Sequence, residues 1–497
     1  MNTKNNVIER IVRGDIYGLK VTVMGLGLHG GGISSARFFA LRGADVTVTD
    51  LQTEERLESS LKELEGIPIR YVLGKHEEED FLKADLIIKN PAVPRSSPIL
   101  KLASTVETDV SIFLRLNREP VIAVTGSKGK STVSSAIHHV LKRIYPQARL
   151  GGNITVSPLT FFKEPFKRES SHYSESTSIR EEAVSPTGSP GTTCRPTVLE
   201  LSSWQLGDLA GKGVLKPYIA IITNILPDHQ NRYPSMEEYI EDKKNIYREQ
   251  DAKCATICNY DDRYGEIFAG ETRARVYYFS YNPLPSGLEG GWLNEKGGIF
   301  RKRDDRGVDQ IFPILPERLL LPGEHNRLNL LCAGIALAIF GVDNNTILEG
   351  LADFSGLKHR LEFVTEKNGV RFYNDSAATI PDSVVNAIKS FNSPLILITG
   401  GTDKNLRFDV LKEVAHIPKE IVLLEGSGTE KIILLLESID RNYSGPFSSI
   451  EEAVIFAFKK AKKGDVVILS PGCASFEMFL NEFDRGEKFK EAVIGLT

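Results

Sequence analysis

Cysteine is scarce in this sequence, with five residues in a chain of 497. The five are irregularly spaced, which is typical of a protein in a reducing compartment. Cys254 and Cys258 are four residues apart, but no second Cys or His pair completes the ligand set of a zinc site. We therefore expect these two cysteines to be packing residues, and the protein to be cytoplasmic.

Long apolar segments are missing too. The longest apolar run, residues 328–341, contains Asn329 and is too short to cross a bilayer, so it predicts a buried helix and no membrane contact. The N-terminal residues are polar and do not resemble a signal peptide. A net charge of −4 and a pI near 6.2 do not indicate the excess of positive charge that is typical of nucleic-acid-binding proteins. We expect a monomer that binds small molecules, with about three domains for this length.

The most informative stretch covers residues 121–132, V-I-A-V-T-G-S-K-G-K-S-T. Its apolar residues predict a buried strand that runs into a glycine loop, and the pattern of residues 133–141 predicts a helix. This order suits nucleotide phosphates, because loop N–H groups and the helix N-terminus face the anion. Lys130 would reach the β- and γ-phosphates, and the Ser131 hydroxyl would ligate Mg²⁺. The loop is two residues shorter than G-x-x-x-x-G-K-[ST], and an ordinary glycine turn is the alternative.

A second glycine motif lies near the N-terminus. Residues 20–24 predict a strand that leads into G-L-G-L-H-G at residues 25–30, which has the form G-x-G-x-x-G. A predicted helix at 33–42 and a strand at 44–49, ending at Asp50, complete a βαβ unit with an acidic residue where a ribose hydroxyl is bound. NAD is the default ligand of this pattern, and helix–strand packing without a ligand is the alternative.

Two further strands are predicted to end in residues that suit a metal. The apolar strand at 197–199 ends in Glu200, and the buried strand at 219–223 is followed by Asp228 and His229. Open α/β sheets bind ligands at the carboxyl ends of their strands, so these side chains would share a crevice with the phosphate loop. Glu200 would hold Mg²⁺ directly or through water. A solvated strand end at Glu200 and a structural role for His229 are the alternatives.

A lysine falls on the apolar stripe of another predicted helix. Met236, Ile240 and Tyr247 recur at helical spacing, and Lys243 lies on the same stripe. Burial disfavours the charged ammonium, and a neutral amine reacts with CO₂ to give a carbamate, which is an anionic metal ligand. The alternative is a side chain that reaches out to water.

The chain after about residue 355 predicts a third domain. Apolar strands at 395–399, 421–424 and 466–469 each run into glycine, serine or charged residues, which is typical of an α/β sheet with one functional edge. Residues 163–196 are rich in Ser, Thr, Glu, Pro and Gly, which predicts a mobile surface insertion, with a lid as the alternative. The predicted α/β domains are residues 1–118, 119–355 and 356–497.

Six motifs occur in the order and at about the spacing of one enzyme family: T-G-S-K-G-K-S-T, L-E-L-S-S-W-Q-L, N-I-L-P-D-H, G-E-H-N-R-L-N, G-L-K-H-R and S-P-G-C-A-S-F. On these motifs the chain resembles the Mur ligases, ATP-dependent amide-forming enzymes of peptidoglycan synthesis, over nearly its whole length apart from the insertion. Its G-L-G-L-x-G and C-A-S-F segments are similar to those of members that add D-glutamate to UDP-N-acetylmuramoyl-L-alanine. The resemblance implies Rossmann-like domains on either side of a phosphate-loop domain, and an acyl-phosphate intermediate.

The resemblance also implies roles for individual residues. The UDP end of the substrate, in place of NAD, would contact Gly25, Gly27, Leu28, His29 and Asp50. ATP would contact Gly126, Ser127, Lys128, Gly129, Lys130, Ser131, Thr132, Asn326, Asn329, Arg360 and Asp375. Two Mg²⁺ ions would be held by Ser131, Glu200, His229 and a carbamylated Lys243. Lys130, His229 and Lys243 would be catalytic, and Lys404 and Ser475 would hold the carboxylates of the incoming glutamate.

Three places depart from the family pattern. Lys128 replaces a common Asn, Ala377 stands where many D-glutamate ligases have Lys, and N-E-F-D-R-G at 481–486 varies the more frequent N-F-E-x-R-G. The last two lie near the expected amino-acid pocket, so a sister ligase that adds L-glutamate or another amino acid is the nearest alternative.

Other classes of protein fit less well. Folylpolyglutamate synthase shares the central domain but lacks an N-terminal UDP-binding domain, so residues 20–50 argue against it. A nicotinamide-dependent oxidoreductase leaves the phosphate loop unused, and a nucleotide-dependent switch does not need three ligand clusters at strand ends.

Overall fold

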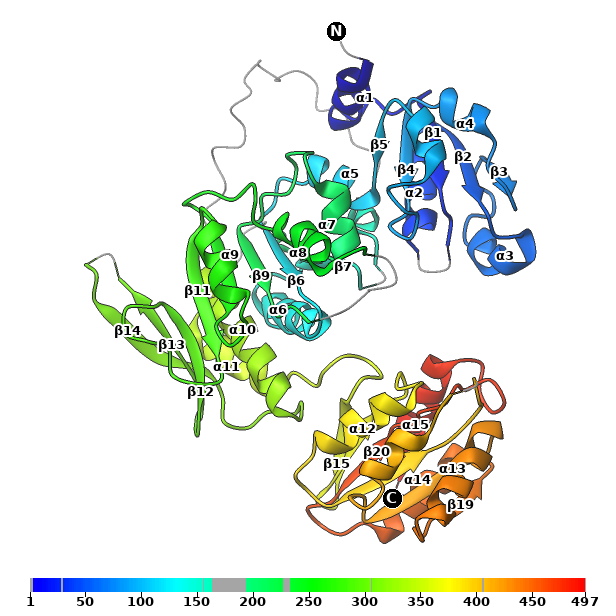
Figure 1. The fold of residues 1–497 in the computed structure, drawn as a ribbon, viewed down its shortest axis with the longest axis vertical. Coiled ribbons are helices and arrows are strands. Elements are labelled where there is room, and N and C mark those ends of the chain that lie inside the picture. Colours follow the sequence, from blue (N-terminus) through cyan, green and yellow to red (C-terminus); the bar gives the residue numbers. More distant parts are fainter. Residues whose placement is uncertain are drawn as a thin grey trace. The chain divides into compact units, whose positions relative to one another are not determined.

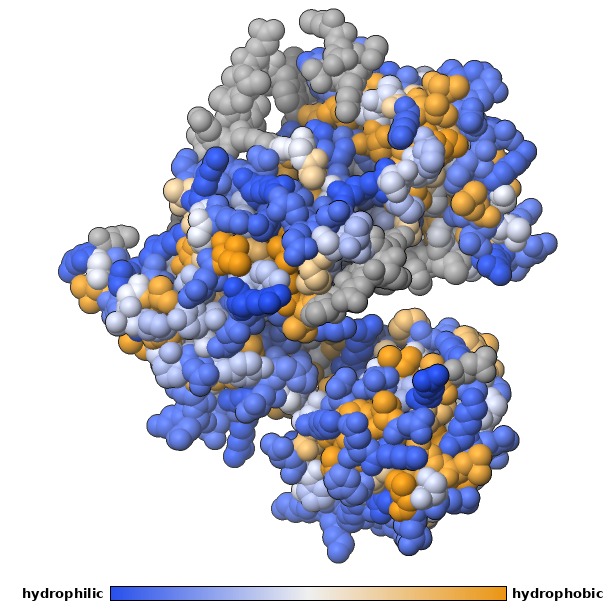
Figure 2. Space-filling model, viewed as in Figure 1, coloured by the Kyte–Doolittle hydropathy of each residue, from blue (hydrophilic) through white to orange (hydrophobic). Residues whose placement is uncertain are grey.

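The computed structural model describes residues 3–27, 30–154, 156–162, 194–226, 233–304, 306–404 and 406–496. The chain divides into two compact units, each built from α/β layers (Figure 1). The first unit contains residues 1–292, 300–312 and 332–344, and the second contains residues 293–299, 313–331 and 345–497. Hydrophilic residues cover most of the visible face of both units, with apolar residues in patches between them (Figure 2).

The N-terminal part of the first unit is a parallel sheet with the strand order β3-β2-β1-β4-β5. The predicted βαβ unit is confirmed, and its helix begins at Gly31. Because all pairs are parallel, the carboxyl ends of the strands lie at one edge, next to the glycine motif. The elements are α1 (Thr3–Val12), β1 (Lys20–Met24), α2 (Gly31–Ala40), β2 (Asp45–Asp50), α3 (Glu54–Lys62), β3 (Ile69–Leu73), α4 (Glu78–Leu82), β4 (Leu86–Lys89), η1 (Pro98–Leu102), β5 (Val106–Glu107) and α5 (Asp109–Leu116).

The second sheet has the strand order β14-β13-β12-β11-β10-β9-β6-β8-β7. Strand β6 pairs in parallel with β8 and with β9, and all three strands are buried, which explains their continuous apolar sequences. The elements up to β11 are β6 (Val121–Thr125), α6 (Lys130–Ile144), β7 (Arg149–Gly152), η2 (Pro158–Phe161), β8 (Thr197–Glu200), α7 (Ser203–Leu209), β9 (Ile219–Ile222), α8 (Met236–Lys244), β10 (Ala255–Asn259), α9 (Gly265–Glu271) and β11 (Arg275–Ser280). They are followed by β12 (Gly290–Asn294), β13 (Gly297–Arg303), β14 (Asp309–Leu315), α10 (Glu324–Phe340) and α11 (Asn344–Ala352).

One cluster of buried apolar side chains runs through both sheets' domains in the first unit. It includes Val23 and Phe39 from the N-terminal domain and Leu199 and Phe268 from the next. The two domains therefore pack against each other through a shared core. The longest apolar run forms α10, as predicted, and among the residues described, none of the helices has both the length and the apolar character to cross a bilayer.

The sheet of the second unit has the order β15-β16-β20-β17-β18-β19, in which only the β15–β16 pair is antiparallel. Along β17, Leu395 and Leu397 enter one apolar cluster while Ile396 and Ile398 enter another, so both faces of the sheet are covered. The elements are β15 (Glu362–Lys367), β16 (Val370–Asn374), α12 (Pro381–Lys389), β17 (Leu395–Thr399), η3 (Asp409–Glu413), β18 (Glu420–Leu424), α13 (Ser427–Ser438), β19 (Ser444–Phe447), α14 (Ile450–Lys460), β20 (Val466–Leu469) and α15 (Glu482–Ile494).

Candidate active site

The phosphate loop joins β6 to α6, and the helix begins at Lys130 rather than at Val133. Gly126 has a φ of +142°, and a Cβ on it would lie 1.9 Å from Thr223 Oγ1, so a larger residue does not fit. Gly129 has a φ of +84° and is the N-cap residue of the helix. The two glycines are therefore needed for different reasons, a close approach at the first and a left-handed backbone at the second.

The end of β9 holds this loop in shape. Thr223 Oγ1 donates a hydrogen bond to the Lys128 carbonyl (2.6 Å), and the Lys128 N–H donates to Asn224 Oδ1 (2.9 Å). The Ser127 N–H donates to the Asn224 carbonyl at 2.9 Å. Because these two loop N–H groups are bonded within the protein, an anion would be met by the N–H groups of the first turn of α6.

Two lysines converge on one carbonyl of the loop. Lys130 Nζ donates to Gly126 O at 2.9 Å and to Ser127 O at 3.1 Å. Lys243 Nζ donates to the same Gly126 O at 2.9 Å and lies 4.6 Å from the centre of the Tyr239 ring. Lys243 is 2% exposed, so its predicted burial is confirmed and the alternative of a side chain in water is wrong.

Glu200 ends β8 beside the phosphate loop. It is 1% exposed, which contradicts the alternative of a solvated strand end. Its Oε1 accepts a hydrogen bond from Asn153 Nδ2 (2.8 Å), while its Oε2 is buried without a hydrogen-bond partner among the described residues. A buried carboxylate oxygen that lacks a donor fits a cation ligand such as Mg²⁺. No group of three or more His, Cys, Asp and Glu side chains that would hold a metal occurs in the described part of the chain, and the predicted ligand His229 lies outside it.

The N-terminal glycine loop is organised by Asp50. Its Oδ2 accepts hydrogen bonds from the N–H groups of Leu26 (2.8 Å) and Gly27 (3.2 Å), and its Oδ1 from that of Gln52 (2.9 Å). Glycine at position 32 lets α2 approach, since a Cβ there would lie 2.4 Å from the Gly25 carbonyl. Asp50 therefore holds the loop itself, which the sequence did not predict. The predicted UDP contacts Leu28 and His29 lie outside the described residues.

The second unit carries the other predicted nucleotide contacts. Asn326 is buried in the first turn of α10, where its Nδ2 donates to the Pro322 carbonyl (2.6 Å), and Asn329 follows half-buried one turn later. Asp375 accepts hydrogen bonds from the Leu361 N–H (3.1 Å) and from Ser470 Oγ (2.8 Å). Burial raises the pKa of Asp375 to about 7. Arg360 is exposed next to this group.

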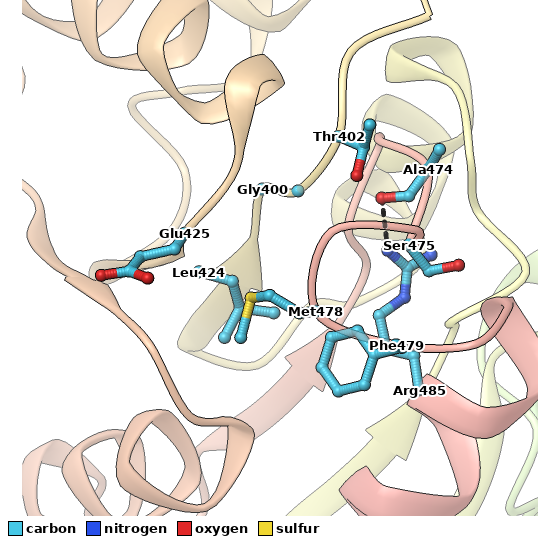
Figure 3. Close-up of a pocket in the computed structure, with 10 residues that line it drawn as sticks. Gly400, Thr402, Leu424, Glu425, Ala474, Ser475, Met478, Phe479 and Arg485 are labelled. Carbon is cyan, nitrogen blue, oxygen red and sulfur yellow. Dashed lines mark hydrogen bonds between the residues drawn. The ribbon is translucent and has the colours of Figure 1, made fainter.

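A pocket opens at the ends of β17, β18 and β20 (Figure 3). Ser475 lies in it with a buried hydroxyl that has no hydrogen-bond partner among the described residues. Lys404 is exposed, and its Nζ lies 5.1 Å from the centre of the Phe476 ring. The loops that carry these residues are bridged by Thr402 and Ala474, which exchange backbone hydrogen bonds of 3.0 Å in both directions.

Sequence reasoning missed Arg485, which is fully buried and is one of the residues that line this pocket (Figure 3). Its guanidinium donates to Ser376 Oγ (3.0 Å), to the Ser376 carbonyl (2.9 Å), and to the carbonyls of Cys473 (3.2 Å) and Ala474 (3.1 Å). Burial lowers its pKa to about 10, so it stays charged at neutral pH. The R-G of the C-terminal motif was visible in the sequence, but its carbonyl partners lie in loops far apart along the chain.

Three family models match the chain along most of its length. The "Mur ligase MurD-like, N-terminal domain" matches residues 19–112, the "Mur ligase middle domain" matches residues 124–337, and the "Mur ligase, glutamate ligase domain" matches residues 359–473. The α/β class and the arrangement in three domains predicted from the sequence are thus confirmed.

Curated relatives match over nearly the whole chain. UDP-N-acetylmuramoylalanine–D-glutamate ligase of Borreliella afzelii (strain PKo) is 40% identical, covering 96% of this chain and 98% of its own. The enzyme of the same name from Roseiflexus sp. (strain RS-1) is 39% identical, covering 97% and 100%, and that of Treponema pallidum (strain Nichols) is 35% identical, covering 96% and 98%.

Solved structures show the same fold. UDP-N-acetylmuramate–alanine ligase MurC of Thermotoga maritima aligns with a TM-score of 0.53 at 20% identity, covering 96% of this chain and 99% of its own. MurF of Acinetobacter baumannii aligns with a TM-score of 0.55 at 16% identity, covering 98% of both chains. With relatives above 30% identity over nearly its full length, the chain belongs to the Mur ligase family.

Proposed function

We propose that this protein is an ATP-dependent ligase that adds D-glutamate to UDP-N-acetylmuramoyl-L-alanine, in the synthesis of peptidoglycan precursors. The observation that carries the proposal is the match, at 35–40% identity over nearly the whole chain, to D-glutamate ligases of three bacteria. The phosphate loop, on which two lysines converge, supports the proposal, because this reaction needs a site for ATP. A nicotinamide-dependent reaction would leave that site without use.

In the first step, the carboxylate of the UDP-linked substrate attacks the γ-phosphorus of ATP, the bond from this phosphorus to ADP breaks, and ADP leaves as the acyl phosphate forms. Lys130 and the N–H groups at the start of α6 would bind the phosphates and neutralise the charge that develops on them. Ser131, Glu200, His229 and Lys243 would hold Mg²⁺, which supplies charge neutralisation at the phosphates when bound. We propose the full ATP-binding set as Gly126, Ser127, Lys128, Gly129, Lys130, Ser131, Thr132, Asn326, Asn329, Arg360 and Asp375.

We further propose that Lys243 is carbamylated in the active enzyme. Two ammonium groups on the Gly126 carbonyl repel each other, and burial disfavours the charge on Lys243. The neutral amine adds to CO₂ and loses one proton, which turns the buried cation into an anion beside the metal ligands. Lys243→Ala should then be inactive and partly rescued by short carboxylic acids such as acetate. An active Lys243→Arg enzyme would contradict the carbamate.

In the second step, the amine of D-glutamate attacks the acyl carbonyl and inorganic phosphate leaves. Lys404 would bind a carboxylate of the amino acid, and the unpartnered Ser475 hydroxyl would donate a hydrogen bond to one. Arg485 would act through Ser475, because it fixes the carbonyls of the two preceding residues. The UDP end of the other substrate would bind at Gly25, Gly27, Leu28, His29 and Asp50.

The domain limits predicted from the sequence are kept as part of the proposal. Each family match lies inside one predicted domain, at residues 19–112, 124–337 and 359–473. The monomeric state and the cytoplasmic location stay predictions, which gel filtration and cell fractionation would check.

The reaction is tested by phosphate release from ATP with UDP-N-acetylmuramoyl-L-alanine and either D- or L-glutamate. We expect release with D-glutamate that depends on both substrates and on Mg²⁺. Equal release with L-glutamate would favour a sister ligase, which the Ala377 departure left open. No release with either amino acid would contradict the proposed function.

A further inference from the structure

Two ion pairs join the end of β4 and the loop after it to helices α7 and α8 of the next domain, within the first unit. Lys89 Nζ lies 2.8 Å from Asp208 Oδ2, and Arg95 Nη2 lies 2.5 Å from Asp242 Oδ2. Both side chains of the first pair are 4% exposed, whereas the Arg95 side chain is 49% exposed and that of Asp242 10%. The segment between Lys89 and Arg95 is thus fixed at both ends on the phosphate-loop domain.

This segment also contacts the N-terminal glycine loop. Asn90 Nδ2 donates to the Gly25 carbonyl (3.2 Å), and a Cβ on Gly25 would lie 2.9 Å from Asn90 Cβ. The segment is closed on itself, because Lys89 Nζ donates to the Val93 carbonyl (2.8 Å) and the Ala92 N–H donates to Asn90 Oδ1 (2.9 Å). A shift of its clamped ends would therefore move the backbone of the glycine loop.

At the other side, the Arg95–Asp242 pair sits on the helix that carries Lys243. Asp242 directly precedes Lys243 in α8, and Tyr233 Oη donates to the same Asp242 Oδ2 (3.0 Å). The pair passes over Gly207 of α7, where a Cβ would lie 2.5 Å from Asp242 Oδ2 and 2.6 Å from Arg95 Cζ. A side chain at this position would force the pair to shift, so the pair as it stands packs closely against the backbone of α7.

We propose that Arg95 is a positioning residue that, through Asp242, holds the helix of Lys243 in register with the glycine loop. The inference rests on the proposed function, in which that loop takes the UDP end of the substrate. The substrate is long, so its uridine end and its reacting carboxylate contact different domains. The position of one domain relative to the other then decides whether the carboxylate meets the γ-phosphate. A misplacement of about 1 Å costs up to roughly 10²-fold in rate. The ATP phosphates would bind between β6 and α6 within the phosphate-loop domain itself, so we expect this register to affect the UDP-linked substrate more than ATP.

The test compares Arg95→Gln, Asp242→Asn, the double variant and Arg95→Lys, with Lys216→Gln as control. Lys216 forms an ion pair with Asp251 (2.6 Å) in the same unit, and neither residue belongs to the glycine loop or to the phosphate loop. We expect each of the two neutral variants to lower kcat/KM for the UDP-linked substrate by roughly tenfold while KM for ATP changes by less than about twofold. The double variant should be no worse than either single one, because the two side chains act as one unit. Arg95→Lys should keep most of the activity, and Lys216→Gln all of it.

Three results would overturn the inference: additive losses in the double variant, equal effects on both substrates, or a lowered unfolding temperature with unchanged kinetics. A wild-type enzyme that does not release phosphate with D-glutamate would instead contradict the proposed function, so the two failures are distinct.

Discussion

At the scale of single residues, the proposed role of Lys130 in binding the ATP phosphates can be tested directly by substitution. Its ammonium donates to the carbonyls of Gly126 and Ser127 in its own loop, four and three residues away, so we expect its removal to leave the fold intact. Lys130→Ala should lower kcat for phosphate release by at least about 10²-fold, because a preorganised charge at the transferred phosphate is lost. Lys142→Ala removes the same charge from the last turn of α6, where its Nζ bonds the Pro146 carbonyl, and should keep wild-type turnover. Near-normal activity of Lys130→Ala would contradict the phosphate-loop assignment.

Asp375 predicts a pH dependence of stability in the second unit. Burial raises its pKa to about 7 in the folded state, above the ordinary value of 3.8. Between these two values the folded state holds the proton and the unfolded state does not. The contribution of this group to the free energy of unfolding is therefore fully present below about pH 3.8. It falls by up to about 1.4 kcal/mol per pH unit as the pH rises toward 7, and it is lost above the folded-state pKa of about 7.

The isosteric variant Asp375→Asn removes this dependence, since an amide does not titrate. Hydrogen exchange of β16 and β20, corrected for its intrinsic pH dependence, should show wild type losing protection relative to the variant between pH 5 and 7. If the corrected protection of the two proteins changed with pH in the same way, the carboxyl group would not titrate in this range.

Sequence patterns were informative for residues where one property decides the outcome. Lys243 fell on an apolar stripe, and the structure buries it; Gly126 followed a strand, and its backbone has the positive φ that only glycine adopts readily. Arg485 could not be found in this way, because its surroundings come from residues 376, 473 and 474. The hydrogen bonds of Asp50 to its own glycine loop were hidden for the same reason.

At the scale of elements, the phosphate loop depends on the contact between Gly126 and Thr223. Gly126→Ala would place a Cβ 1.9 Å from Thr223 Oγ1 and would also strain a backbone at φ +142°. We expect loss of ATP binding, measured by calorimetry, and lower stability. Gly270→Ala in α9 meets nothing within 4 Å and should be neutral or stabilising by roughly 0.5–1 kcal/mol. Normal ATP affinity in Gly126→Ala would show that ATP binding does not require the close contact between Gly126 and Thr223.

The loops around the pocket of the second unit are joined by Glu477. It accepts hydrogen bonds from the N–H and the hydroxyl of Ser427 at the start of α13, both at 2.8 Å, and its own N–H donates to Thr402 Oγ1 (3.1 Å). Glu477 thereby ties the segment of Ser475 to the segment that leads to Lys404.

Glu477→Gln should therefore raise KM for D-glutamate several-fold, since a charge-assisted pair of hydrogen bonds becomes a neutral one. KM for ATP should not change. Glu451→Gln weakens a contact of the same kind, with Ser449 at the start of α14, and serves as the control. An equal rise in KM for ATP would indicate a general loss of structure.

At the scale of the whole molecule, the order of strands and helices followed from the sequence because parallel strands buried on both faces are apolar throughout. β6, β8 and β9 are of this kind, and each was predicted. The pairing of the domains could not be predicted, since it depends on ion pairs such as Lys89–Asp208 between residues far apart in the chain. Contacts between side chains of two different domains produce no periodic pattern in the sequence.

The insertion predicted at residues 163–196 gives a last test on the whole chain. Its core, residues 163–193, lies outside the described residues, but both flanks are anchored. The Phe162 ring lies 5.7 Å from that of Phe113, and its carbonyl accepts a hydrogen bond from Arg42 (2.8 Å). On the other flank, the Arg195 N–H donates to Glu119 Oε2 at 3.2 Å.

The residues of these anchors lie outside 166–192. We therefore expect the fold to stay intact when residues 166–192 are replaced by a Gly-Ser linker of about ten residues, which spans roughly 17 Å on average. We expect turnover and KM for all three substrates within about twofold of wild type, because the composition of this segment predicts a surface insertion without a functional role. Phe162→Ala is the control for damage to an anchor, and it should lower the unfolding temperature. A loss of turnover of about a hundredfold in the linker variant, with an unchanged unfolding temperature, would instead show that the insertion excludes water from the acyl phosphate as a lid does.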